Sequence, residues 1–242
     1  MNGEEKIHTA EIKTDSKFLR WFENFWYHHK WTTIMVSFFA VVVLICTLQM
    51  CTKEESDISF VYAGPVQMSS AEMDNVEKVM NFVMPEDFDK SGDKLSAVIN
   101  YQIYSEEQIK KLEDSNSEGG VGFYVDRSYN SSNYDDFYKY IQTGESSICF
   151  LDPSLFEAIK ERDRFMKLSD VLGYAPEDAA DEYGVRLGDT DIYEEYGALG
   201  VLPEDTVVCI LRPLVVGKSS KPELYQNEKD MLKAILEFSV EK

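Results

Sequence analysis

Histidine, the side chain that most often acts as a general base at neutral pH, is confined to the start of this chain. His8, His28 and His29 are the only three histidines among the 242 residues, so residues 58–242 contain none. That part of the chain cannot build a Ser–His or Cys–His nucleophile pair, or a metal site that uses histidine. We expect it to have no catalytic residue, no metal site and no cofactor.

Two cysteines of this region, Cys149 and Cys209, lie in the apolar runs SICFL and TVVCILRPLVV. A reactive thiolate needs an electropositive and partly open site. We therefore interpret both as small buried hydrophobic side chains. A disulfide between neighbouring strands is the alternative, because an oxidising compartment would permit one. We predict that no disulfide is obligatory.

Acidic residues offer two weaker candidates. The segment Asp87–Gly92 imitates the first half of a calcium loop, D-x-D-x-S-G, but Lys94 replaces an apolar residue and Val98 replaces the final acid. We interpret the segment as a polar turn and leave calcium binding open. The run Tyr174–Asp205 holds many acids, as a carboxylate-dependent hydrolase would need, yet no motif pairs two of them.

An apolar run, WTTIMVSFFAVVVLICTLQMCT, must position everything that follows it. It covers residues 31–52, with no charged residue between Lys30 and Lys53. At a rise of about 1.5 Å per residue, about 20 apolar residues cross the hydrocarbon core of a bilayer. We predict a transmembrane helix over residues 31–52, in contact with the lipid bilayer.

The basic residues that flank this run predict its orientation. Lys17, Arg20 and Lys30 precede it closely, whereas only Lys53 follows it closely, beside three acidic residues. Because basic residues are retained on the cytoplasmic side, we predict a cytoplasmic N-terminus. The chain would then be a single-pass protein of the cell membrane, with residues 53–242 extracytoplasmic.

The region before the predicted span has two parts. Residues 1–16 are polar and lack periodicity, so we expect a disordered cytoplasmic tail. Residues 17–30 are rich in aromatic side chains, which prefer the headgroup layer, and we expect an interfacial helix there, with partner binding as the alternative. A cleaved signal peptide fits poorly because no small-x-small site follows the run, and a lipoprotein signal ending at Cys51 is the nearer alternative.

The net charge of −20 belongs to the residues after the span, because residues 1–30 contain five basic and five acidic side chains. Binding a polyphosphate chain requires Lys and Arg to replace counterions, and a uniformly acidic surface repels it. We therefore expect no nucleic acid partner. Plain solubility is the ordinary reason for such acidity.

Strand and helix patterns alternate after a short charged linker, residues 53–57, and residues 58–242 suffice for one domain with its own core. The second strand alternates apolar and polar residues, which predicts a position at or near a sheet edge. We expect a loop over residues 114–133. Residues 174–205 are acidic and irregular, and four glycines divide them into pieces too short for long elements. The predicted strands are 58–63, 95–104, 147–151 and 206–212, and the predicted helices begin near Ser69, Ser105, Asn133, Pro153 and Pro222.

This alternation predicts an α/β fold, with a mainly parallel sheet covered by helices on both faces. In such sheets ligands bind beyond the carboxyl ends of the strands. The residues found there are Gly64 and Pro65, Ser105, and Asp152, which we take as candidate ligand-binding or partner-binding residues. Each also has a local structural role as a turn or helix-capping residue, which is the competing interpretation.

The stretches GESSICFLDPSLFEAIKERDRFMKLSDVL and YQNEKDMLKAILEFS, with the order of elements before them, resemble one lobe of an extracytoplasmic solute-binding protein. The resemblance covers about two thirds of residues 58–242 and implies a solute-binding-like α/β lobe. There is no room for a second lobe, so no two-lobe clamp is implied and no ligand residue can be transferred. The whole chain also resembles uncharacterised single-pass, membrane-anchored proteins of Gram-positive gut bacteria.

Three classes of function are compatible with these observations. The first is a non-catalytic, membrane-anchored extracytoplasmic binding or interaction module, whose partner would be a protein or an envelope polymer. The second is an accessory subunit of a membrane complex that contacts partners through the span and the aromatic segment. The third, a carboxylate-dependent hydrolase, lacks a supporting motif. We predict the first.

Overall fold

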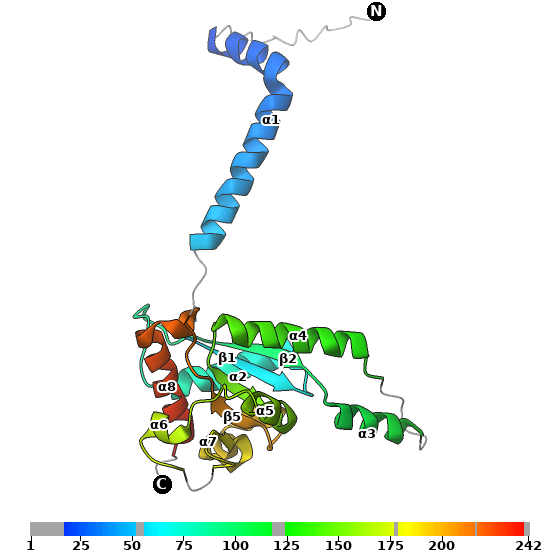
Figure 1. The fold of residues 1–242 in the computed structure, drawn as a ribbon. Coiled ribbons are helices and arrows are strands. Elements are labelled where there is room, and N and C mark those ends of the chain that lie inside the picture. The colour runs from blue at the N-terminus through cyan, green and yellow to red at the C-terminus, as the bar shows by residue number, and fades with distance from the viewer. Residues whose placement is uncertain (1–16, 52–55, 118–123, 177–178, 216, 240–242) are drawn as a thin grey trace, which may run out of the picture. The chain divides into compact units, whose positions relative to one another are not determined.

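The computed structural model describes residues 17–51, 56–117, 124–176, 179–215 and 217–239 (Figure 1). The predicted tail, residues 1–16, and most of the predicted linker 53–57 lie outside the described residues. The chain divides into two compact units, Met1–Glu54 and Glu55–Lys242. Each unit is considered by itself.

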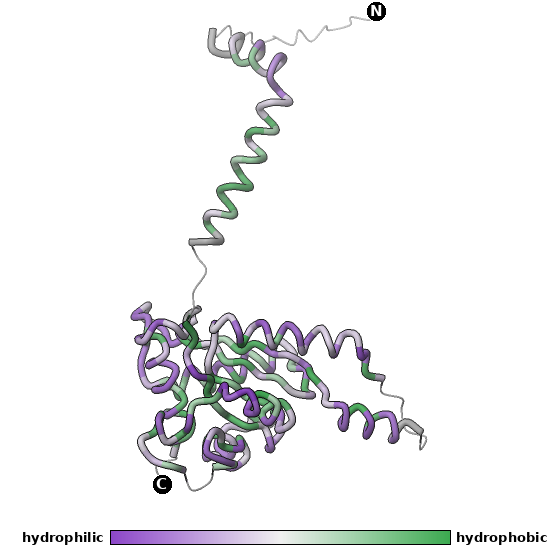
Figure 2. Tube along the Cα trace, in the orientation of Figure 1, coloured by the Kyte–Doolittle hydropathy of each residue, from purple (hydrophilic) through white to green (hydrophobic). Residues whose placement is uncertain are grey.

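The described residues of the first unit form one helix, α1 (Lys17–Cys51), of 35 residues. This single helix covers both the aromatic segment and the apolar run, which the sequence pattern divides at residue 30. Its portion Asn24–Leu48 is long and apolar enough to cross a membrane, and almost all of its side chains are exposed within this unit. Figure 2 shows the apolar colour concentrated along this portion of α1.

The second unit is built on a five-stranded sheet with the strand order β2-β1-β3-β5-β4. The prediction of a mainly parallel sheet is only partly correct. The first three strands are parallel to one another, but β5 is antiparallel to both of its neighbours, so the sheet is mixed. The strands are β1 (Ile58–Gly64), β2 (Ser96–Gln102), β3 (Ile148–Leu151), β4 (Gly184–Arg186) and β5 (Val207–Ile210).

The connection between β4 and β5 explains this reversal. A strand becomes parallel to its predecessor only if the connection returns along the length of the sheet, as a full-length helix does. Residues 187–206 contain only short helices of three to five residues, η1 (Leu187–Asp189), α7 (Asp191–Glu195) and η2 (Gly197–Val201). The two ends of this connection stay paired, since Leu187 N donates to Thr206 O at 2.7 Å. The chain therefore re-enters the sheet at the end where it left it.

Two sets of helices cover the two faces of the sheet (Figure 1). Alternate side chains of β1 enter two separate apolar clusters, with Phe60 and Tyr62 on one face and Val61 and Ala63 on the other. The first cluster is covered by α2 (Ser70–Val83), α6 (Leu168–Leu172), α7 and α8 (Pro222–Leu236). The second is covered by α4 (Arg127–Thr143) and α5 (Pro153–Lys160). The remaining elements are α3 (Glu106–Ser117) and η3 (Lys218–Ser220).

Helix α4 begins earlier than its sequence pattern indicates. The expected loop over residues 114–133 is wrong at both ends, because α3 continues to Ser117 and α4 begins at Arg127. Asp126 caps α4 by accepting hydrogen bonds from the backbone N–H groups of Ser128 and Tyr129. The helix ends at Thr143. Gly144 follows the last helical residue with a φ of 68°, the left-handed conformation that glycine adopts most readily.

Strand β2 lies at the sheet edge, as its alternating pattern predicts. Neighbouring helices supply side chains to the backbone groups on its outer side. From α2, Asn81 Oδ1 accepts a hydrogen bond from Ser96 N at 2.6 Å, and Glu77 Oε1 accepts one from Val98 N at 2.8 Å. From α4, Asn133 Nδ2 donates to Gln102 O at 2.9 Å. These side chains occupy the positions that a further strand would use.

Candidate functional site

Two of the predicted site residues, Gly64 and Asp152, meet where β1 and β3 end. The backbone N–H of Asp152 donates to the carbonyl of Ala63 at 2.8 Å. A Cβ atom at position 64 would lie 3.4 Å from Cβ of Asp152 and only 2.6 Å from the hydroxyl oxygen of Tyr62. Glycine is therefore required here by close approach of side chains, and the residue is itself buried.

Asp152 uses its carboxylate within the protein. It is 8% exposed and caps α5, with Oδ1 accepting from the backbone N–H of Ser154 at 2.9 Å and from its hydroxyl at 2.5 Å. Oδ2 accepts from Nε2 of Gln108 at 2.8 Å. This arrangement gives Asp152 the capping role that its sequence context indicates, and it also joins two turns of the same sheet edge.

Ser105 and Pro65 complete the set of predicted site residues. Ser105 and Gln108 form a capping box at the start of α3, because Ser105 N donates to Gln108 Oε1 at 2.8 Å and Gln108 N donates to Ser105 Oγ at 3.2 Å. The carbonyl of Pro65 accepts a hydrogen bond from Nε2 of Gln102 at 3.2 Å. The structure thus links Ser105 to Asp152 through Gln108, and Gly64 lies beside Asp152. Ser105 alone of the four predicted residues lines one of the cavities described below.

Two adjoining cavities, here called the tyrosine cavities, open beyond the carboxyl end of β2. The first has a volume of about 370 Å³ and lies among the starts of α3, α4 and α5, with Ser105, Ser131 and Tyr134 in its wall. The second has a volume of about 200 Å³ and is lined by Gln102, Tyr124 and Tyr129. Tyr104 and Asn130 line both cavities.

Asn130 fixes Tyr104 at the junction of the tyrosine cavities. Its Oδ1 accepts from Tyr104 N at 2.8 Å, and its Nδ2 donates to Tyr104 O at 3.0 Å. The hydroxyl of Tyr104 accepts from Nε2 of Gln102 at 2.8 Å. Burial raises the pKa of the Tyr104 hydroxyl above its ordinary value.

The α4 residues of this site are not predicted from the sequence, because the pattern there indicates a loop up to residue 133. A usable signal was present. Asn130, Tyr134, Phe137 and Ile141 recur at helical spacing, and Asp126 stands where a helix N-cap would precede them.

A third cavity, of about 490 Å³, is lined by acidic residues, most of them from the 174–205 run, in which no sequence motif pairs two acids. Asp181 is committed to internal contacts, since Oδ1 accepts from Tyr183 N at 2.8 Å and Oδ2 lies 2.6 Å from Nζ of Lys160. The lining includes one arginine, Arg186. The acids that line this cavity are Glu157, Asp181, Asp189, Glu204 and Asp205.

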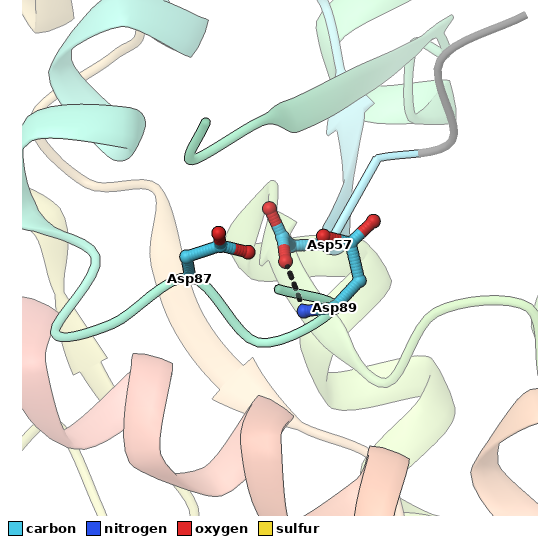
Figure 3. Close-up of side chains that lie close together, drawn as sticks. All are labelled: Asp57, Asp87 and Asp89. Atoms are coloured by element: carbon cyan, nitrogen blue, oxygen red, sulfur yellow. Dashed lines mark hydrogen bonds between the residues drawn. The ribbon is translucent and has the colours of Figure 1, made fainter. Parts of the chain in front are cut away.

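The calcium-like turn gains a third carboxylate from elsewhere in the chain (Figure 3). One oxygen from each of Asp57, Asp87 and Asp89 lies within 4.8 Å of the others. The oxygens also serve the backbone: Asp57 accepts from Asp89 N at 2.8 Å and Leu95 N at 2.9 Å. Oδ2 of Asp87 accepts from the N–H of Gly92 at 2.8 Å. Hydrogen bonds from Ser91 lower the pKa of Asp89. The cluster offers the oxygen ligands that calcium prefers, but its bonds are those of a polar turn.

Cys149 and Cys209 face each other directly across the antiparallel pair of β3 and β5. Both are free thiols with 0% exposure, and each lies within hydrogen-bond distance of a backbone carbonyl, at 3.6 Å from Ser147 O and 3.7 Å from Cys149 O respectively. Burial raises the pKa of the Cys209 thiol, which opposes formation of a nucleophilic thiolate.

The site therefore consists of turns that interlock at the carboxyl edge of the sheet and of two tyrosine-lined cavities beside them. Comparison of the chain with models of protein families, with curated proteins and with solved structures finds no match.

Proposed function

We propose that this chain is a membrane-anchored, extracytoplasmic, non-catalytic binding or interaction module. The observation that carries the proposal is the division of the chain into an exposed apolar helix and a separate α/β unit with its own core. An exposed helix of this length and composition is unfavourable in water and favourable in a bilayer. The α/β unit is then the part that meets partners.

The proposed orientation follows from the distribution of basic residues. Lys17, Arg20 and Lys30 precede the apolar run, and retention of these residues in the cytoplasm carries residues 53–242 across the cell membrane. The acidic composition of the outer unit makes nucleic acid an unsuitable partner there.

The proposed binding face is the carboxyl edge of the sheet, where Gly64, Pro65, Ser105 and Asp152 fix the turns. The hydrogen bonds of these turns are made to neighbouring residues of the protein. In binding, the turns would therefore hold in place the walls of the adjacent tyrosine cavities. A single lobe resembling that of a solute-binding protein leaves a small ligand half exposed. A protein or an envelope polymer, which contacts a wider surface, is the better partner.

Absence of catalysis is part of the proposal. Residues 58–242 contain no histidine, and both cysteines of the described outer unit are buried thiols. The acids around the third cavity include Asp181, whose carboxylate is held by Lys160 and the backbone. These features support binding over nucleophilic or acid–base chemistry.

An accessory subunit of a membrane complex is the second candidate, because α1 carries an exposed aromatic segment. Trp21 stacks on Phe25 with ring centroids 5.5 Å apart, and Phe22 stacks on Trp26 at 6.2 Å. All four rings are at least 37% exposed. Such rings suit the headgroup layer, and they equally suit a neighbouring membrane helix.

Replacement of α1 separates the two candidates. A tagged full-length chain and a chain with residues 17–51 exchanged for an unrelated transmembrane helix are cross-linked in native cells and captured. We expect the same partners with both chains. Loss of all partners from the exchanged chain would favour the accessory subunit, and hydrolysis of captured material by the purified protein would contradict the non-catalytic assignment. The exchanged helix fused to an unrelated outer domain is the control.

A further inference from the structure

We propose that the tyrosine cavities form a binding site for an uncharged carbohydrate, so that the envelope-polymer partner of the proposed function is a neutral glycan. This inference rests on that proposed function and specifies its partner. It is drawn from the exposed aromatic rings, from the charge balance and from the hydroxyl groups of the cavity walls.

Exposed aromatic rings are the first observation. Tyr129 is 56% exposed and Tyr124 is 83% exposed, although both line the second tyrosine cavity. In the first cavity, Tyr134 lies parallel to Tyr138, with an interplanar angle of 4° and ring centroids 6.4 Å apart. The C–H groups on one face of a sugar ring form an apolar surface that packs flat against such a ring. Tyrosine presents this surface at low cost in side-chain entropy.

The second observation is the small net charge of the cavity walls, which is unusual for a chain with a net charge of −20. Arg127, which lines the first cavity, pairs with Glu106 at 3.0 Å and with Glu113 at 3.1 Å. Asp126 lines the second cavity, and one of its carboxylate oxygens accepts hydrogen bonds from the backbone N–H groups of Ser128 and Tyr129 at the start of α4. An anion would have to displace the two carboxylates that pair with Arg127, whereas a neutral ligand would not.

The distribution of hydrogen bonds is the third observation. Both polar atoms of the Asn130 side-chain amide are hydrogen-bonded to the backbone of Tyr104. Among the described residues, the hydroxyl groups of Tyr129, Ser131 and Tyr134 have no hydrogen-bond partner. Each hydroxyl can donate and accept, which matches the hydroxyls of a sugar. The walls thus combine apolar ring faces with neutral polar groups, as carbohydrate recognition requires.

Binding of defined oligosaccharides tests the proposal. The full-length chain is placed in lipid nanodiscs, because glycoside detergents would compete, and is titrated with uncharged hexasaccharides of glucose and of N-acetylglucosamine by calorimetry. We expect at least one of them to bind. Tyr129→Ala should weaken that binding about tenfold, the loss of roughly one ring contact. Tyr129→Phe should retain most of it because the ring remains.

Tyr174→Ala is the matched control, because Tyr174 is also an exposed tyrosine, at 48%, and lines neither tyrosine cavity. Absence of binding by the unsubstituted chain to either hexasaccharide would overturn the inference. So would equal affinities of Tyr129→Ala and Tyr174→Ala, or tighter binding of an anionic glycerol-phosphate polymer or of a captured protein at these cavities. A partner still captured through the outer unit would then leave the proposed function standing.

Discussion

The side-chain amide of Gln108 donates a hydrogen bond of 2.8 Å to Oδ2 of Asp152, which caps a different helix. Gln108 belongs to the capping box of α3, and Asp152 is the N-cap of α5. One hydrogen bond therefore ties two helix starts at the carboxyl edge of the sheet. Substitutions at Asp152 should affect both.

We expect Asp152→Ala to lower the free energy of unfolding by about 2 kcal/mol, with about 1 kcal/mol from the lost N-cap and about 1 kcal/mol from the unpaired amide of Gln108. Urea unfolding measures this loss. Asp126→Ala, which removes an exposed N-cap from α4, is the control and should cost only the capping contribution. In a double-mutant cycle Gln108→Ala should recover part of the loss. Strict additivity would contradict the link.

Gly64→Ala should destabilise the outer unit by about 1–3 kcal/mol through overpacking, because the added methyl group would lie 2.6 Å from the hydroxyl of buried Tyr62. Combining it with Tyr62→Phe should reduce the cost, since the closest atom is then absent. Gly197→Ala is the control: its added Cβ meets nothing within 4 Å. Thermal unfolding of Gly64→Ala, Tyr62→Phe, their combination and Gly197→Ala measures these costs. Equal losses of stability in Gly64→Ala and Gly197→Ala would refute the argument.

Cys149 and Cys209, which lie opposite each other in the sheet, should behave as ordinary core side chains. Cys149→Ala and Cys209→Ala should each cost about 1–2 kcal/mol, as truncations of fully buried residues do. No obligatory disulfide is expected, although the two residues are directly opposite. Mass measurement of the purified chain without reductant checks this, and a mass two daltons below the reduced value, lost on reduction, would contradict it.

Local signals in the sequence predicted much of the fold. The helix start near Ser69 is confirmed, where Ser69 and Glu72 form a capping box, as are the Asp152 N-cap and the edge position of β2. Each depends on residues close in sequence or on alternation within one strand, where propensity and hydrogen bonding agree. An α/β fold with helices on both faces follows from the same patterns.

The direction of β5 could not be predicted in the same way. It depends on whether residues 187–206 cross the sheet, and their short helices carry little periodicity. The tyrosine cavities were missed for a related reason, because they require the first two turns of α4 to face Tyr104. The third carboxylate, Asp57, likewise reaches the turn only through tertiary structure.

The protected edge of the sheet leads to a further prediction. Glu77→Ala leaves the Val98 N–H at the edge without its acceptor and should cost about 1–2 kcal/mol. It should also accelerate amide hydrogen exchange at Val98 and promote self-association through the open edge, visible by sedimentation. Glu77→Gln keeps an acceptor oxygen and should behave almost as the unsubstituted chain. Unchanged exchange at Val98 in Glu77→Ala would show that the carboxylate does not protect the edge.

The role of Asp57 distinguishes a polar turn from a calcium site. Its carboxylate holds two backbone N–H groups, those of Asp89 and Leu95, and an amide side chain retains only one acceptor oxygen. Hydrogen bonds to backbone N–H groups also engage Asp87 and Asp89, since Gly92 N donates to Asp87 Oδ2 and Ser91 N donates to Asp89 Oδ1, each at 2.8 Å. We therefore expect Asp57→Asn to lower the free energy of unfolding by about 1–2 kcal/mol, equally in chelator and in millimolar calcium. If calcium stabilises the unsubstituted chain and Asp57→Asn abolishes that gain, the three carboxylates form a metal site instead.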